Sequence, residues 1–248
     1  MVSHKKCEVN LMANMHNQES SFNARMTYQA DAQELSETRY NLTIGATLTW
    51  GFFLNFLLLQ FVGPAILNMI YTSPQSYSTF MIGFLIGYVV LVLIGSSMVR
   101  SYNPVKCFIG YNLIAIPVGI VVAMATIGYD PALVTRAALV TAIVTLSMMI
   151  VSMILPDTFS RMGSGLGVSL LIVIIVESLS MLLFRSAITL IDWIVVVIMA
   201  MYIGYDWVRA NSVQRTTTNA IAAASALYLD IINIFLRVLR ILARSRDN

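Results

Sequence analysis

The stretch that decides the fold is TTTNAIAAASALYLDIINIFLRVLRILAR, residues 216–244. It offers Thr218 or Asn219 as a helix N-cap and then stays apolar for longer than the roughly 20 residues that a membrane crossing takes. Asp230 lies near its middle, where a carboxylate costs about 2.5–3.5 kcal/mol on membrane-insertion scales. Because a chain keeps such a residue where it faces a partner, water or an ion, the stretch predicts both a membrane helix and a functional site.

The composition of the whole chain also indicates a membrane protein. Of its 248 residues, 58% are hydrophobic and 11% are charged, whereas a soluble domain carries about 25% charged residues. The formal net charge of +3 is small and forms no basic stripe, so nucleic acid is not an expected partner. Both histidines, His4 and His16, lie near the N-terminus, and Cys7 and Cys107 are expected to be free thiols. No spacing of metal ligands stands out, and no cofactor is predicted.

Seven apolar segments follow a polar N-terminal tail, and each is near the length of about 20 residues that spans the hydrocarbon core. They are residues 42–67, 79–99, 105–127, 133–155, 166–184, 190–207 and 219–242. The connections between them are short and carry prolines, including 68–78 between the first two segments. We therefore predict an all-α polytopic membrane protein, with a flexible tail over residues 1–40 and a seven-helix transmembrane domain over residues 41–248.

Small residues predict where these helices pack closely. Gly83 and Gly87 form one GxxxG pair, and Gly163 and Gly167 form another. The alanines of residues 222–226 make the first half of the last helix slim. This slim half predicts a helix that is surrounded by others.

The positive charges favour a cytoplasmic N-terminus, because more of them then fall in the inside connections. The inside connections would carry Arg100, Lys106, Arg161, Arg209 and Arg215, and the outside ones Arg136 and Arg185. Seven crossings would place the arginines after Asp230 outside, so the side of the C-terminus stays open. The tail has no apolar core of a cleaved signal peptide. With no disulfide pattern, these features fit a bacterial inner membrane and leave an internal eukaryotic membrane open.

Two acids in neighbouring segments are the main candidates for function. Asp206 and Asp230 flank a short connection, so they would lie at similar depth, about 12 Å and about 16 Å from the turn at 1.5 Å per residue. Two carboxylates that meet in a low dielectric share a proton, and their titration belongs to the pair. Without the proton, they offer the oxygen ligands that calcium prefers.

Other charged residues have open roles. Glu177 lies in an apolar run and could face the same cavity or pair with an arginine at its level. Arg100 ends the second segment, either as an interfacial anchor or as a partner that folds in on an aspartate. Arg237 and Arg240 are expected to extend to the far interface.

The residues around the two aspartates resemble the Bax-inhibitor-motif family of small polytopic membrane proteins. Residues 226–235, ALYLDIINIF, are similar to the family's C-terminal ALYLDFINLF-type signature, with Ile231 where phenylalanine is usual. Gly204, Tyr205 and Asp206 resemble the motif of its penultimate helix. The end of the second segment, with Arg100, is a weaker match. The likeness in hydropathy covers roughly residues 40–245.

The resemblance implies a bacterial-type member with seven helices, the last at the centre of the other six. It implies a pH-sensitive calcium leak, with Asp206 and Asp230 as the sensor and transient calcium ligands. Arg100 would latch onto this pair in the closed state, whereas Glu177 has no place in the family pattern. The expected partners are the bilayer, calcium, protons and other membrane proteins, since family members also regulate cell death and membrane-protein quality control.

Other functions remain open on the sequence. The same carboxylates would serve a calcium/proton exchanger, and the glycine-rich faces would serve a membrane interaction protein that moves no ion. An enzyme is not predicted. An intramembrane aspartyl protease would fit Tyr205 and Asp206, but Asp230 lacks the Gly-x-Gly-Asp that such enzymes carry. A serine protease would lack a histidine in the membrane segments to activate the serine.

Overall fold

The computed structural model describes residues 33–184 and 189–247, and in this part the chain forms eight helices and no strand. Most of the predicted tail, and the connection that contains Arg185, lie outside the described residues. The helices are α2 (Glu37–Thr72), α3 (Pro74–Met98), α4 (Pro104–Thr126), α5 (Pro131–Ile154), α6 (Pro156–Arg161), α7 (Gly163–Phe184), α8 (Thr189–Ser212) and α9 (Thr217–Asp247). The predicted all-α class is therefore confirmed.

The helix starts follow from the local sequence. Four helices begin with proline, which has no N–H to leave unpaired and a φ already suited to the first turn. Asn103 and Asp130 cap α4 and α5, each accepting a backbone N–H at 2.9 Å. For α9 the predicted cap was wrong, because the helix begins earlier. Thr216 caps it, and its Oγ1 accepts the N–H of Asn219 at 3.2 Å.

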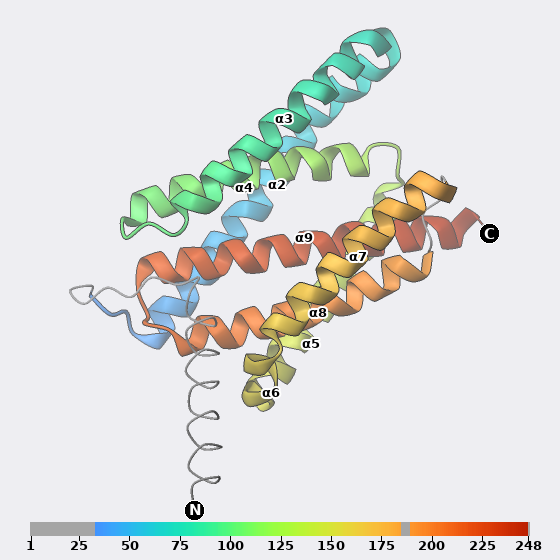
Figure 1. Cartoon of the computed structure of the whole chain (residues 1–248). Helices are drawn as coiled ribbons and strands as arrows, with labels where there is room; N and C mark the ends of the chain where they lie inside the picture. Colours follow the sequence, from blue (N-terminus) through green and yellow to red (C-terminus); the bar gives the residue numbers. More distant parts are fainter. Residues whose placement is uncertain (1–32, 185–188, 248) are drawn as a thin grey trace, which may run out of the picture.

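The first two helices differ from the sequence prediction. The expected connection over residues 68–78 shrinks to Ser73, because α2 continues to Thr72 and α3 begins at Pro74. With 36 residues, α2 is about 54 Å long at 1.5 Å per residue. It is thus longer than the hydrocarbon core, and the α2–α3 hairpin projects beyond the other helices (Figure 1).

The last helix lies against much of the bundle. α9 packs against α2, α4, α5 and α8, and the contact between α8 and α9 is the most extensive of all helix pairs. Figure 1 shows α9 running between α4 and α8. Ala220, Ala223 and Ala224 are fully buried, so the first half of α9 packs closely against its neighbours.

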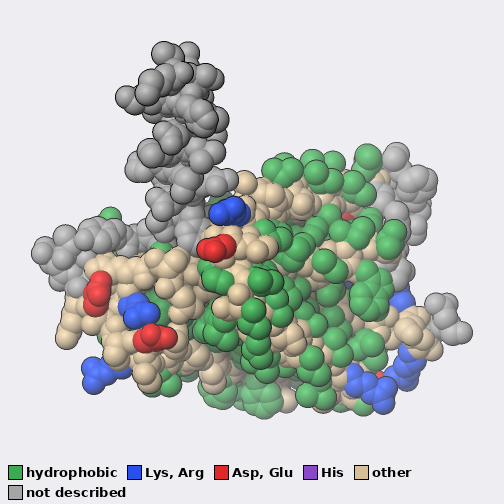
Figure 2. Space-filling model, turned by 90° about the horizontal axis from the view of Figure 1, so that it is seen from below, with side chains coloured by type: hydrophobic (Ala, Val, Ile, Leu, Met, Phe, Trp, Pro, Cys, Tyr) green, Lys and Arg blue, Asp and Glu red, His purple; other side chains and the backbone are tan. Residues whose placement is uncertain are grey.

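A broad apolar surface surrounds the bundle. Five helices, α2 to α5 and α8, are long and apolar enough to cross a membrane, and α7 contributes a shorter apolar helix, Gly163–Leu179. Many large hydrophobic side chains are exposed on these helices, among them Phe61, Ile82 and Ile143. On the face in Figure 2, hydrophobic side chains cover the middle and charged ones gather toward the two ends. This distribution is typical of an integral membrane protein.

The close approach between α3 and α4 depends on Gly95 and Gly110, which belong to no GxxxG pair in the sequence. A Cβ built on Gly110 would lie 2.7 Å from the backbone nitrogen of Val99 and 2.8 Å from the carbonyl oxygen of Gly95. By contrast, nothing lies within 4 Å of such an atom on Gly83 or Gly87. The prediction of close packing at that GxxxG pair was wrong, because this part of α3 is not pressed against a neighbouring helix.

Candidate functional site

The two predicted aspartates are buried on neighbouring helices. Asp206 lies on α8 and Asp230 on α9, with exposed fractions of 5% and 9%. α8 continues past Trp207 to Ser212, as the estimate of similar depth required, and the two helices run antiparallel (Figure 1). A carboxylate this deep needs a charge or hydrogen-bond partner.

Asp206 has a buried arginine beside it. Nη1 of Arg209 lies 3.1 Å from Oδ1 of Asp206, and the arginine is only 3% exposed. Its guanidinium carbon lies 5.5 Å from the centre of the Tyr205 ring, within the range of a cation–π interaction. The placement of Arg209 in an inside connection was therefore wrong. Its spacing of three residues from Asp206 could have revealed the pair, since such residues share a helix face.

The three residues of the penultimate-helix motif have separate structural roles. Asp206 pairs with Arg209, and Tyr205 places its ring against the same guanidinium. Gly204 leaves room for Phe159 of α6, whose ring a Cβ at this position would overlap. The motif thus joins a charge pair to a close helix contact.

The motif on α9 anchors that helix to α2 and α4. The hydroxyl of Tyr228 donates to Oδ1 of Asn55 on α2 at 2.8 Å. The same hydroxyl approaches the backbone oxygen of Ala115 on α4 at 3.3 Å. Asn55 is itself buried, and the sequence analysis did not single it out. These contacts fix the position of α9 along its axis relative to α2 and α4, and therefore the depth of Asp230.

Arg100 forms no ion pair with Asp206 or Asp230 in the described part of the chain. It follows the end of α3, and its side chain is exposed. α3 packs against α4 and α2, and no ion pair joins Arg100 to an acid within residues 33–184 and 189–247. The latch role of Arg100 stays a prediction.

A second cluster of charges lies near the other end of α9. Arg237 makes a two-point contact with Glu177 of α7, at 2.6 and 2.7 Å, and also donates to Asp192 of α8 at 2.9 Å. Asp192 further accepts from Arg240 at 3.0 Å and from Arg244 at 2.8 Å. We call these five residues the arginine clasp, because they join α7, α8 and α9.

The arginine clasp gives Glu177 a role and changes the predicted role of Arg237 and Arg240. Glu177 has an arginine partner near its level, which was one of its two expected roles. Arg237 and Arg240 do not simply extend to the far interface, because both contact acids of other helices. Asp192 was missed, although its position in the first turn of an apolar segment could have drawn attention. It is only 1% exposed.

An exposed ion pair lies at the same end of the bundle. Oδ1 of Asp130 accepts the N–H of Ala132, and Nη1 of Arg246 lies 3.0 Å from its Oδ2. These two donors hold the pKa of the Asp130 carboxyl below its usual value. The contribution of this group to stability is therefore present above its unfolded pKa of about 4 and is lost as the pH falls through the lower folded value.

The predicted calcium ligands do not belong to a larger set of metal ligands. Within the described ranges, no three histidine, cysteine, aspartate or glutamate side chains come together as a metal site. Transient binding of calcium by Asp206 and Asp230 stays a prediction.

Long apolar helices, a broad exposed apolar surface and buried charges define an integral polytopic membrane protein. A family model described as inhibitor of apoptosis-promoting Bax1 matches residues 40–247. The chain therefore belongs to this family, which is the Bax-inhibitor-motif family expected from the two aspartate motifs. No curated protein and no solved structure matches the chain.

Proposed function

We propose that this protein is a pH-sensitive calcium leak channel, without enzymatic activity, in a bacterial inner membrane. The observation that carries the proposal is the pair of buried carboxylates on α8 and α9 in a chain of this family. Buried acids in a membrane protein are costly and mark ion or proton paths. Asp206 and Asp230 would bind calcium transiently when ionised and release it when protonated.

The proposal includes seven crossings with a cytoplasmic N-terminus and α9 at the centre of the other six. Five helices meet the length and hydropathy of a crossing, and α7 and α9 would supply the other two. The contacts of α9 with α2, α4, α5 and α8 support a central position. In this topology the arginine clasp faces the outside, and Arg209 lies toward the cytoplasmic side.

Calcium flux into liposomes tests the aspartate pair. We expect wild-type flux to change between pH 6 and 8, and expect Asp206→Asn and Asp230→Asn to alter the flux and flatten this change, because an amide cannot release the shared proton. Asp130→Asn is the matched control. Asparagine keeps the helix cap, and Asp130, with its lowered pKa, stays ionised throughout this range.

Unchanged pH-dependent flux in both membrane variants would rule out the pair as the sensor. Flux that requires an opposing proton gradient would replace the leak with a calcium/proton exchanger. If wild type moves no calcium at any pH, the aspartates are structural and a role in binding other membrane proteins becomes the better proposal.

The two arginines should act differently on this flux. Arg209 lies 3.1 Å from Asp206, so Arg209→Gln should shift the midpoint of the pH response by about one unit or more, one unit being 1.36 kcal/mol of interaction. Arg100 is exposed and would reach the pair only if α3 moved, so Arg100→Gln should raise flux at the pH where wild type is closed. Equal effects of both substitutions on the midpoint would contradict separate roles for a fixed partner and a latch.

A further inference from the structure

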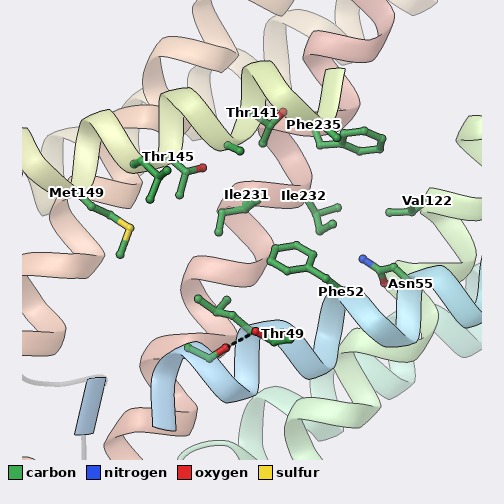
Figure 3. Close-up of a pocket in the computed structure, with 15 residues that line it drawn as sticks. Thr49, Phe52, Asn55, Val122, Thr141, Thr145, Met149, Ile231, Ile232 and Phe235 are labelled. Atoms are coloured by element: carbon green, nitrogen blue, oxygen red, sulfur yellow. Dashed lines mark hydrogen bonds between the residues drawn. The ribbon is translucent and has the colours of Figure 1, made fainter. Parts of the chain in front are cut away.

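The strongest unexplained feature is an open apolar cleft between α2 and α5, with α9 as its floor. Its volume is about 600 Å³, a size typical of ligand sites. Figure 3 shows Thr49, Phe52 and Asn55 of α2 facing Thr141 and Thr145 of α5, with Ile231 and Ile232 of α9 behind them. Because α2 and α5 carry exposed apolar side chains on their outer faces, this cleft opens into the part of the surface that lipid tails cover.

A polar pocket of about 380 Å³ lies between the same two helices, one turn nearer the start of α2. Asn41 of α2 and Ser152 of α5 line it, and Trp207, Asn211 and Arg215 close it from α8 and the residues after it. Ser152 lies three residues after Met149, which lines the apolar cleft. The two hollows are thus about one helical turn apart, and we call them together the α2–α5 furrow.

Three buried polar atoms in the α2–α5 furrow have no hydrogen-bond partner among the described residues. They are Oδ1 of Asn41 and Nε1 of Trp207 in the polar pocket, and Oγ1 of Thr145 in the apolar cleft. Buried polar atoms are nearly always satisfied, so each such atom calls for an explanation. A headgroup with both donors and acceptors in the polar pocket would satisfy Oδ1 of Asn41 and Nε1 of Trp207 after a small rotation of each side chain, because atoms this buried do not reach the pocket surface in the present conformation.

The dimensions of the α2–α5 furrow match one leaflet of a bilayer. The apolar cleft runs along α5 from Ala138 to Met149, which is about 16 Å at 1.5 Å per residue. Half of the hydrocarbon core is about 15 Å. The polar pocket follows where α2 and α5 reach the interface, so a lipid with its tail in the cleft would have its headgroup in the pocket.

The charges in the polar pocket favour a zwitterionic headgroup. Glu37 and Arg215 lie 3.3 Å apart and both are solvent-accessible. An ammonium group can donate to Glu37 and to Oδ1 of Asn41, whereas a phosphate can accept from Arg215 and from the indole N–H of Trp207. The donors and acceptors of the pocket thus complement a primary ammonium joined to a phosphate.

We propose that the α2–α5 furrow is a binding site for one phospholipid with a primary ammonium headgroup, of the phosphatidylethanolamine type. One acyl chain lies in the apolar cleft and the headgroup lies in the polar pocket. The floor residues Ile231 and Ile232 directly follow Asp230, so the lipid touches the helix that carries the candidate sensor. The site itself does not depend on the proposed calcium leak.

Photolabelling of the full chain in vesicles tests this site. The probes are phosphatidylethanolamine and phosphatidylcholine that carry the same diazirine-labelled acyl chain, each at low fraction in unlabelled phosphatidylcholine. We expect phosphatidylethanolamine to label residues 138–153 of α5 more strongly. Ala142→Trp fills the cleft and should remove most of this labelling, whereas Ile143→Trp, which adds the same ring on the exposed face of α5, should retain it.

Trp207→Phe tests the headgroup assignment, because it keeps an aromatic ring and removes only the N–H donor. In wild type, labelling by phosphatidylethanolamine is also compared with labelling by a diazirine-labelled fatty acid, which has no phosphate or ammonium group. We expect Trp207→Phe to reduce binding of both phospholipids by about tenfold, the effect of losing one hydrogen bond to a charged group. Equal labelling of α5 in wild type and Ala142→Trp would overturn the acyl-chain site. Equal labelling by both phospholipids, or by the fatty acid, would overturn the headgroup assignment.

Discussion

Arg237→Gln is expected to lower the free energy of unfolding by about 2–4 kcal/mol, among the largest single effects in the chain. Breaking a buried ion pair costs about 3–5 kcal/mol, because the partner is left as an uncompensated buried charge. Because Arg237 is 18% exposed, water compensates part of the lost pair, and we expect a cost somewhat smaller than for a fully buried pair. The substitution leaves Glu177 without its two-point contact, and leaves Asp192 with fewer donors.

Thermal unfolding in detergent measures this effect through the thiol of Cys107, which is fully buried, in a Cys7→Ser background. Arg246→Gln is the control. It removes an arginine from the same helix, but its pair with Asp130 is exposed, and exposed pairs contribute only about 0–1 kcal/mol. Adding Glu177→Gln to Arg237→Gln should restore part of the stability, since it removes the unpaired charge. An unchanged unfolding midpoint for Arg237→Gln would show that the arginine clasp does not stabilise the fold.

Gly110→Ala is expected to separate α3 from α4, at a cost of about 1–3 kcal/mol for an overpacked contact. The added Cβ would meet the backbone of Val99 and Gly95, and backbone atoms cannot move aside as a flexible side chain can. Cys107 reports the separation directly, because its thiol donates to the carbonyl oxygens of Ser101 at 2.9 Å and Val99 at 3.3 Å. Its reaction with a thiol reagent below the unfolding temperature should become faster.

The control for this substitution is Gly83→Ala on the same helix. It has open space around the new Cβ, and replacing a glycine within a helix gains up to about 1 kcal/mol from helix propensity. We expect wild-type thiol reactivity and equal or higher stability. If Gly110→Ala behaves like Gly83→Ala, the contact between α3 and α4 is not close enough to constrain α3.

The apolar segments of the sequence located seven of the eight helices in the described part of the chain, and the short helix α6 was missed because it falls in a predicted connection. Each predicted segment falls on one helix, and the prolines mark where the helices begin, because these signals are local. The connection before Pro74 was predicted too long, because α2 continues through polar residues such as Asn68 and ends only at Thr72.

The candidate site could be predicted only in part. Asp206 and Asp230 stood out because a carboxylate is rare in an apolar run. The partners of the charged residues could not be found, because they depend on which helix faces meet. Arg237 pairs with Glu177, which lies sixty positions earlier in the chain. The α2–α5 furrow forms only when α2 and α5 both pack on α9.

The arginine clasp has a consequence for how the chain is made. Arg237, Arg240 and Arg244 would each be costly to place in lipid alone, and the acids that neutralise them belong to α7 and α8. Both of these helices precede α9 in the chain, so they are synthesised first. The last helix can therefore enter the membrane beside acids that are already in place, and biosynthesis from the N-terminus supplies the order of insertion that this fold requires.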